Sequence, residues 1–367
     1  MTTLDDKIKS YITNGKINIP ETEWGSLCSS YEKDELINAL SSAISSGLID
    51  LPLKNITLDD AIKAQKGLME LKTSLKTGYV FSRYEENMDD FYFDESASYN
   101  DASNYFHQLS RYTADSINSP SPVRTWSTFK FAKSMVSALF TLKMKEVDKK
   151  SLHACLAMRK YIAGQFKPSV AKAVYDFFES ENVVDLCAGW GDRLSGFYAS
   201  KTTKSYFGID PNTALCEGYK NQIFEYNKLV KKDVTMICQA AEDESVILPS
   251  CDLVFTSPPY FGIERYSKDP NQSYLRYRKF ENWLNNFLFE IIKKSYNALE
   301  RKGHLVLNIS DVYMNHTINK ICEPMVEFCK CLGFKHVGTY GMRMSKRINS
   351  ESYKNGIFCE PVYIFEK

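Results

Sequence analysis

The sequence lacks the features that mark several protein classes. Its ten cysteines form no C-x-x-C pair, and its five histidines do not alternate with them at zinc-ligand spacing. We therefore predict reduced, mostly buried thiols and no metal site. No apolar run reaches the roughly 18–20 residues that cross a bilayer, and the first thirty residues lack the apolar core of a secretion signal. These absences predict a soluble, cytoplasmic protein without a membrane partner.

Charge is nearly balanced overall but unevenly placed. The 367 residues carry a net charge of +1, from 46 Lys and Arg against 45 Asp and Glu. Residues 1–100 hold 10 basic and 17 acidic residues, whereas residues 111–172 hold twelve basic and three acidic ones. A local excess of positive charge is typical of a surface that binds a polyanion. A solvated helical face would give the same pattern.

The pattern of apolar residues divides the chain into three regions. Residues 1–122 predict a mainly helical region for recognition or dimerisation, and its last part, 82–122, is acidic, aromatic and turn-rich. Residues 123–160 predict a basic helical connector. Over 161–367 short apolar strands alternate with helices, which predicts an α/β domain with a mostly parallel sheet. The predicted strands are 183–187, 205–210, 234–240, 251–257, 303–310 and 360–367.

A glycine-containing turn, DLCAGWGDRL, follows the first of these strands. Asp185 stands at the strand end, and Gly189 and Gly191 let the backbone come close to a ligand. The spacing is not the G-x-G-x-x-G of dinucleotide-binding proteins, which argues against a nicotinamide or flavin. The second strand ends at Asp210, whose carboxylate can accept both hydroxyls of a ribose. The glycine turn and Asp210 together indicate a nucleoside-containing ligand. The alternative is an ordinary α/β fold that binds no nucleoside.

A second motif, TSPPYF, follows the strand at 251–257. Two successive prolines fix φ and donate no N–H, so the preceding carbonyls project rigidly. The Ser257 hydroxyl and the Pro258 carbonyl could then hold the hydrogens of an exocyclic base amine while its nitrogen attacks a methyl group in line. Tyr260 would stack on the extruded base. The alternative is a buried turn that only ends the strand.

Together, DLCAGWGDRL, the strand end GID and TSPPYF resemble the motifs of S-adenosylmethionine-dependent DNA amino-methyltransferases. The resemblance covers about residues 161–367. It implies the class I methyltransferase fold, a Rossmann-like seven-stranded, mostly parallel sheet with a reversed final hairpin, here with a mainly helical N-terminal extension. It also implies S-adenosylmethionine as cofactor, no metal, and double-stranded DNA as partner with base flipping. The catalytic residues that it implies are Ser257, Pro258, Pro259 and Tyr260.

The resemblance also implies a cofactor site. The segment around Phe166 resembles the one that touches the methionine end of the cofactor. Asp243, with Glu242 beside it, corresponds to the acidic position that meets the adenine. The full set of predicted cofactor-binding residues is Phe166, Pro168, Asp185, Cys187, Ala188, Gly189, Gly191, Asp210, Asp243 and Thr256.

The base that is methylated depends on the first residue of the S-P-P-Y motif. Serine resembles the N4-cytosine enzymes, whereas the N6-adenine enzymes more often have Asp or Asn there, so we favour cytosine and keep adenine as the alternative. Methylation at C5 of cytosine needs a thiolate, usually presented by a Pro-Cys pair, and the sequence has no such pair. An RNA or protein amine methyltransferase, and a non-catalytic nucleic-acid-binding subunit, are further alternatives.

The residues that contact DNA are expected in loops. Tyr and Arg alternate after the S-P-P-Y motif, and such residues can stack on bases and contact phosphates. A second basic group lies in the connection at 340–358. The sequence leaves open the target sequence, the oligomeric state and whether a restriction endonuclease is a partner. The predicted nucleic-acid-binding residues are Phe261, Arg265, Tyr266, Arg276, Arg278, Lys346 and Arg347.

Overall fold

The chain folds into two compact units, each made of two separate stretches of sequence. Residues 1–55 join 109–164 in the first unit, and residues 56–108 join 165–367 in the second. The predicted boundaries at residues 122 and 160 therefore differ from the divisions in the structure. No helix among the described residues is long and apolar enough to span a membrane. The computed structural model describes residues 3–94, 97–160, 162–314, 316–344 and 356–367.

The first unit is helical and has a hydrophobic core of its own. Leu36, Leu40 and Ile44 recur at helical spacing and are all buried in that core. The indole of Trp126 donates a hydrogen bond to the carbonyl of Ile49 at 2.7 Å and so ties the two stretches together. The helices of this unit are α1 (Leu4–Ser10), α2 (Glu21–Ser30), α3 (Lys33–Ser45), α6 (Pro122–Trp126), α7 (Phe129–Val136), α8 (Ala138–Thr141) and α9 (Lys149–Arg159).

The second unit is built on a sheet in which seven strands follow the order β9-β8-β7-β10-β12-β16-β15. The first five are parallel neighbours, and β16 is inserted antiparallel between β12 and β15. This order, with its reversed final hairpin, confirms the predicted class I methyltransferase fold. The strands are β7 (Asn182–Asp185), β8 (Ser205–Ile209), β9 (Asp233–Ile237), β10 (Cys251–Thr256), β12 (Leu299–Asn308), β15 (Lys335–Arg343) and β16 (Ile357–Glu366).

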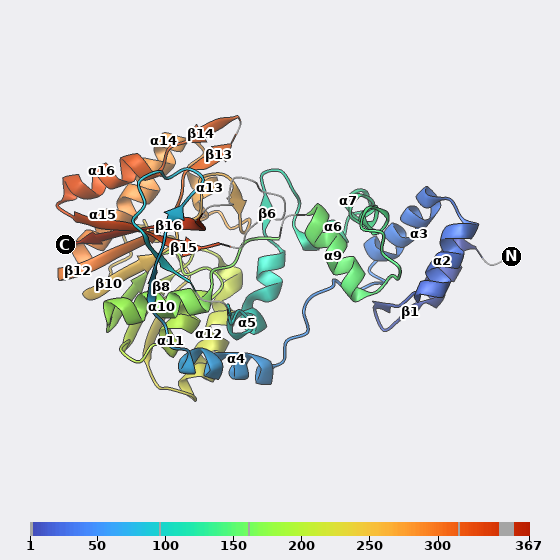
Figure 1. The fold of residues 1–367 in the computed structure, drawn as a ribbon, viewed down its shortest axis with the longest axis horizontal. Helices are drawn as coiled ribbons and strands as arrows, with labels where there is room; N and C mark the ends of the chain where they lie inside the picture. Colours follow the sequence, from blue (N-terminus) through green and yellow to red (C-terminus); the bar gives the residue numbers. More distant parts are fainter. Residues whose placement is uncertain (1–2, 95–96, 161, 315, 345–355) are drawn as a thin grey trace. The chain divides into compact units, whose positions relative to one another are not determined.

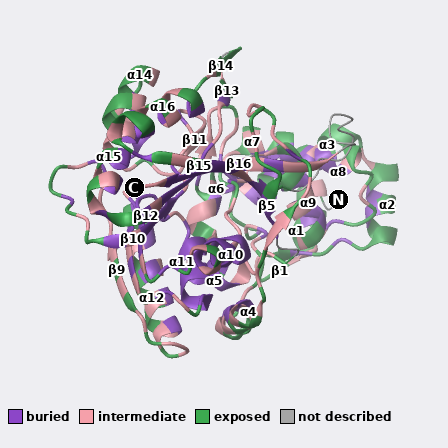
Figure 2. Ribbon diagram, turned by 60° about the vertical axis from the view of Figure 1, so that its left-hand side comes forward, coloured by how far each residue is buried: buried purple, intermediate pink, exposed green. Residues whose placement is uncertain are grey.

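Helices cover both faces of this sheet. Figure 1 shows α15 and α16 on one face and α10 and α11 on the other. Figure 2 shows that α10 and α11 are buried along most of their length, as are the central strands. Both faces of a parallel sheet need such cover because its strands are apolar on both sides. The helices are α10 (Pro168–Phe178), α11 (Asp192–Ala199), α12 (Cys216–Asn227), α13 (Ser273–Arg276), α14 (Phe280–Trp283), α15 (Phe289–Ala298) and α16 (Cys322–Leu332).

The segment that precedes the predicted catalytic region also contributes to the sheet. Strand β5 (Phe91–Phe93) pairs parallel to β15, and β3 (Leu75–Thr77) pairs antiparallel to β5. A third short strand, β4 (Val80–Phe81), pairs with β16. The prediction of a mainly helical N-terminal region did not include these strands, because two or three residues are too few to show a period. Two further helices of this segment are α4 (Leu58–Glu70) and α5 (Asp101–Tyr112), the latter running across the division at residue 108.

Candidate active site

The two sequence motifs lie side by side at the carboxyl ends of neighbouring strands. Strand β10 pairs with β7, so Thr256 comes next to Asp185. The Thr256 hydroxyl donates a hydrogen bond to Asp185 Oδ1 at 2.8 Å and accepts one from the Cys187 amide at 2.9 Å. All three residues are buried. The S-P-P-Y turn is therefore fixed to the glycine turn by hydrogen bonds, as a shared site requires.

The buried carboxylate of Asp185 is the centre of a hydrogen-bond network beneath the glycine turn. Its carboxylate accepts two hydrogen bonds from Arg193, at 2.7 Å from Nε and 3.2 Å from Nη2, and one at 2.7 Å from the Tyr206 hydroxyl. Arg193 also donates to the carbonyl of Cys187. Sequence reasoning missed Arg193, although an arginine eight residues after a buried acid signals a charge that needs a partner. Both oxygens of the buried Asp185 carboxylate thus have protein partners, which fix the strand end against the glycine turn.

The glycine turn presents open backbone to a ligand. Gly189 and Gly191 have φ values of 62° and 72°, a conformation that side chains rarely adopt. A Cβ on Gly189 would meet nothing closer than 3.9 Å, so space is left in front of it. The Gly189 amide donates to Asp210 Oδ2 at 2.9 Å. Burial raises the pKa of the Asp210 carboxyl to about 6.

Helix α5 supports the turn from the other side, which the sequence did not predict. The ring of His107 lies where a Cβ on Gly191 would come within 2.9 Å of Nε2, so this position admits only glycine. Asp192, the first residue of α11, accepts hydrogen bonds from Asn100 at 3.2 Å and from Ser103. Burial lowers the pKa of His107 to about 4, so the imidazole is neutral and acts as packing.

The acidic pair after β9 is bound by an arginine of α13, which follows the S-P-P-Y turn. Arg276 Nη1 lies 2.8 Å from Glu242 Oε1 and 2.7 Å from Asp243 Oδ1. Glu242 is 9% exposed, and burial raises the pKa of its carboxyl. Arg276 was predicted to contact nucleic acid, but the structure pairs it with the predicted adenine site. It links that site to the loop that follows the S-P-P-Y turn.

The remaining predicted cofactor residues line the same region. The Phe166 ring packs edge-on against Phe255, 5.7 Å between centroids, and the Arg193 guanidinium lies 5.2 Å from its centre. Pro168 begins α10 and is buried, and the Ala188 amide donates to the Ile209 carbonyl at 2.8 Å. The Cys187 thiol is buried, which raises its pKa.

The S-P-P-Y turn has polar partners on both sides. Ser257 Oγ lies 3.4 Å from Asn308 Oδ1, at the end of β12. The Tyr260 amide donates to Glu264 Oε2 at 3.1 Å, and the Tyr260 hydroxyl donates to Glu360 on β16. Burial, with the two glutamates nearby, holds the pKa of the Tyr260 phenol well above its usual value. The sequence predicted the turn but neither glutamate.

The residues predicted to contact nucleic acid differ from one another in how far they are buried and in what they contact. Phe261 is 6% exposed and packs against Phe280 and Trp283, so it belongs to the hydrophobic core instead. Tyr266 packs edge-on against Trp190, 5.0 Å between centroids. Arg265 is partly buried with its guanidinium 5.9 Å from the ring of Tyr274, and Arg278 is exposed. Lys346 and Arg347 lie outside the described residues.

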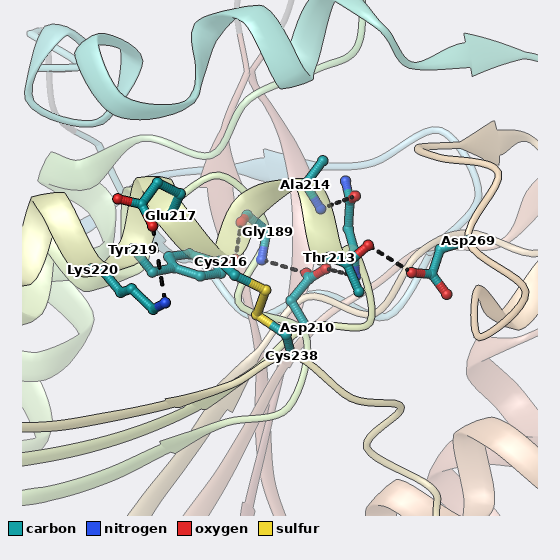
Figure 3. Close-up of a disulfide and its surroundings, with 11 residues drawn as sticks. Gly189, Asp210, Thr213, Ala214, Cys216, Glu217, Tyr219, Lys220, Cys238 and Asp269 are labelled. Carbon is teal, nitrogen blue, oxygen red and sulfur yellow. Dashed lines mark hydrogen bonds and ion pairs between the residues drawn. A yellow bond between two sulfur atoms is a disulfide. The ribbon is translucent and has the colours of Figure 1, made fainter.

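Two cysteines near the site form a disulfide, contrary to the prediction of reduced thiols. Cys216 starts α12 and Cys238 follows β9, with 6.2 Å between their Cα atoms. Figure 3 shows the bridge beside Asp210 and below Gly189. The sequence could not reveal this pairing, because the two residues are 22 apart and meet only through the parallel pairing of β8 and β9. No metal-binding group of His, Cys, Asp and Glu occurs among the residues that the structure describes.

Comparison with known families finds one match. Residues 251–367, which start at β10 and include the S-P-P-Y turn, match the family model described as DNA methylase. The match confirms the resemblance for this part of the chain, which is similar to the DNA methylase family over residues 251–367. No curated protein matches the sequence.

Solved structures with a similar fold include methyltransferases of several kinds. TrmN from Thermus thermophilus is 13% identical, with a TM-score of 0.36, and the match covers 56% of this chain and 50% of TrmN, about half its length. Precorrin-6y C5,15-methyltransferase from Geobacter metallireducens GS-15 is 17% identical, with a TM-score of 0.34. The match covers 55% of this chain and 88% of the methyltransferase. The N-methyltransferase NodS from Bradyrhizobium japonicum WM9 is 12% identical, with a TM-score of 0.29. The match covers 51% of this chain and 86% of NodS. Such distant likeness carries no information about the substrate.

The cofactor implied by this family, S-adenosylmethionine, fits the residues that are present. Asp210 offers a carboxylate for ribose hydroxyls, and Gly189 leaves room for a ligand against the backbone. Glu242 and Asp243 follow β9, the next strand of the sheet, and their carboxylates could accept hydrogen bonds from the adenine amine. Bound there, S-adenosylmethionine would supply an electrophilic methyl group on a sulfonium.

Proposed function

We propose that this chain is a DNA methyltransferase that transfers a methyl group from S-adenosylmethionine to an exocyclic amine of a flipped base, with N4 of cytosine favoured. One observation carries the proposal: Thr256 hydrogen-bonds Asp185 and Cys187, so the S-P-P-Y turn opens next to the glycine turn. A methyl donor and an acceptor amine can then meet across a short distance in a fixed orientation, which is the main requirement for this reaction.

Each residue of the turn has a proposed role. The Ser257 hydroxyl and the Pro258 carbonyl accept the two amine hydrogens, which draws the nitrogen lone pair out of conjugation with the ring. The Pro259 ring keeps the turn rigid, and Tyr260 stacks on the extruded base. Transfer forms a nitrogen–carbon bond and breaks the carbon–sulfur bond, so the nitrogen becomes cationic and the sulfonium becomes a neutral thioether. The nitrogen then loses one proton to water.

Cytosine is favoured over adenine because of Ser257. A hydroxyl accepts one hydrogen but carries no charge, whereas the adenine enzymes that the motif resembles more often use a carboxylate or an amide. The matched family has both N6 and N4 in its name, so it does not separate the two bases. Adenine methylation would keep the proposed mechanism and change only the base.

Double-stranded DNA is the proposed partner. Within residues 109–164 of the first unit, Lys130, Lys133, Lys143 and Lys150 are exposed and suit contacts with phosphates. In the second unit, Tyr266 and Arg278 are the proposed contacts near the active site. We retain recognition or dimerisation as the proposed role of the N-terminal region. A restriction endonuclease partner would be consistent with a site-specific enzyme.

The proposal is tested by methyl transfer from labelled S-adenosylmethionine to mixed-sequence duplex DNA, with RNA of equal length and casein as parallel substrates. We expect label in duplex DNA. Label in RNA or casein but not in DNA would contradict the proposed substrate. Binding of S-adenosylmethionine by calorimetry with no transfer to any substrate would indicate a non-catalytic binding subunit.

Cofactor affinity should fall in mild acid because of Asp210. Its carboxyl titrates at about 6, above its ordinary value, and only the ionised form accepts both ribose hydroxyls. Between pH 7 and pH 5 the ionised fraction drops about tenfold, so the dissociation constant should rise about tenfold. Calorimetry across this range measures the effect, with Asp210→Asn as the control. Parallel curves for wild type and Asp210→Asn would rule out this role for Asp210.

A further inference from the structure

Two carboxylates lie against the S-P-P-Y turn and have no part in the reaction as proposed above. Glu264 Oε2 accepts the main-chain N–H of Tyr260 at 3.1 Å. Glu360 accepts the hydroxyl hydrogen of the same tyrosine. Neither glutamate is exposed. The tyrosine proposed to stack on the target base is therefore held by an acid at its backbone and by another at its ring.

Glu360 reaches the site because β16 runs opposite to its neighbours. The beginning of this strand lies where β10 and β12 end, and Asn308 pairs with Val362 across the ladder. The Asn308 amide donates to the Pro361 carbonyl at 3.0 Å and also hydrogen-bonds Glu360. Its other end lies 3.4 Å from Ser257 Oγ. Glu360 is thus linked to both ends of the turn. It contacts Tyr260 directly, and it is linked to Ser257 through Asn308.

In the part of the chain that the structure describes, no Lys, Arg or His forms an ion pair with Glu264 or Glu360. A buried carboxylate without a cation is costly, and burial raises the pKa of both side chains, that of Glu264 to about 7. Such an arrangement favours any group that becomes positive beside it. The amine nitrogen becomes positive during methyl transfer.

We propose that Glu264 and Glu360 are positioning residues of the target-amine site, which hold Tyr260 and Asn308 in place and supply the negative charge that Ser257 lacks. This inference rests on the proposed function, because it concerns the same amine. The nitrogen–carbon bond forms as the carbon–sulfur bond breaks, and the charge on nitrogen is balanced by the carboxylates until one proton leaves to water. The S-P-P-Y turn has a neutral serine at its first position, and Glu264 and Glu360 then supply the negative charge from other parts of the fold.

The acids should give the reaction a dependence on pH. The titratable groups that face Glu264 are Tyr260, Tyr266 and Glu360, and Cys322 lies near Tyr260. Burial raises the pKa of Tyr260 and Cys322, so neither titrates near neutrality. Because the Glu264 carboxyl is neutral below about pH 7 and charged above it, the rate of transfer should rise as the pH passes through about 7. Burial also raises the pKa of the Glu360 carboxyl. The two acids interact, so the rise belongs to the pair.

The experiment compares Glu264→Gln and Glu360→Gln with wild type. Glutamine keeps the shape and a hydrogen-bonding oxygen but removes the charge. Single-turnover transfer to duplex DNA is followed from pH 5.5 to 8.5, cofactor affinity by calorimetry, and order of the turn by hydrogen exchange of the peptide covering 256–266. Glu323→Gln is the matched control, because this glutamate on α16 has a side chain that is 71% exposed and lies outside the turn.

We expect each glutamine variant to transfer about 10- to 100-fold more slowly above pH 7, with a flatter pH profile. Cofactor affinity and hydrogen exchange should match wild type, as should every property of Glu323→Gln. Wild-type rates in both variants would overturn the proposal, and so would faster exchange together with an unchanged shape of the pH profile, since that combination marks a purely structural role. Wild-type protein that binds S-adenosylmethionine but methylates no DNA would instead overturn the proposed function, and this inference with it.

Discussion

Asp185→Asn should lower the free energy of unfolding by about 3–5 kcal/mol, the usual cost of removing one member of a buried ion pair. Asp185 is fully buried, and the Arg193 side chain is 5% exposed. Without the carboxylate, the guanidinium would keep its charge in the protein interior with too few acceptors. Urea unfolding followed by circular dichroism measures the change, with the midpoint and the slope reported separately.

The matched control for this prediction is Asp233→Asn. Asp233 begins β9, two strands away from β7, and is exposed, so the same chemical change should cost less than about 0.5 kcal/mol there. An Asp185→Leu, Arg193→Met double variant should lose less stability than Asp185→Asn, because removing both charges leaves none unpaired. A loss below about 1 kcal/mol in Asp185→Asn would show that the pair does not hold the turn.

Ser257→Ala and Tyr260→Ala should each reduce methyl transfer about 10- to 100-fold. The serine change removes an acceptor for an amine that becomes charged, an interaction worth about 1.5–3 kcal/mol. The tyrosine change removes stacking on the base, worth about 1–3 kcal/mol. Both residues are in the S-P-P-Y turn and outside the cofactor residues, so the affinity for S-adenosylmethionine should stay as in wild type. The rates come from single-turnover assays on duplex DNA, and the affinities from calorimetry.

Two further variants separate catalysis from folding. Tyr260→Phe keeps the ring but loses the hydrogen bond to Glu360, so its transfer should be slowed less than that of Tyr260→Ala. Tyr79→Ala changes a tyrosine that is 65% exposed, and it should behave as wild type. If Tyr260→Ala transferred methyl groups at the wild-type rate, the turn would have another role than holding the base.

Much of the catalytic unit could be predicted because its signals are local. A strand that ends in Asp185 and a glycine turn, or in Thr256 and two prolines, is visible in ten residues of sequence. Gly333 is a local signal of the same kind, since α16 stops there with a glycine φ of 103°. Asp311 accepts the amides of Ile321 and Cys322 where this helix begins.

The contacts that escaped prediction join residues far apart in sequence. His107 packs on Gly191, Arg276 pairs with Glu242, and Glu360 reaches Tyr260 only after the sheet has formed. Phe261 was misjudged for a related reason. An aromatic residue after a catalytic turn has the same sequence pattern whether it faces a base or the core, and Phe280 and Trp283 settle the matter only in three dimensions.

The S-P-P-Y turn is proposed to direct a methyl group to an exocyclic amine. The most direct measurement is mass spectrometry of nucleosides from duplex DNA incubated with the protein and S-adenosylmethionine, with a Ser257→Ala, Tyr260→Ala double variant in parallel. We predict N4-methylcytosine from wild type and little or none from the double variant. Methylation at C5 of cytosine, or no methylated nucleoside although the cofactor binds, would contradict the account.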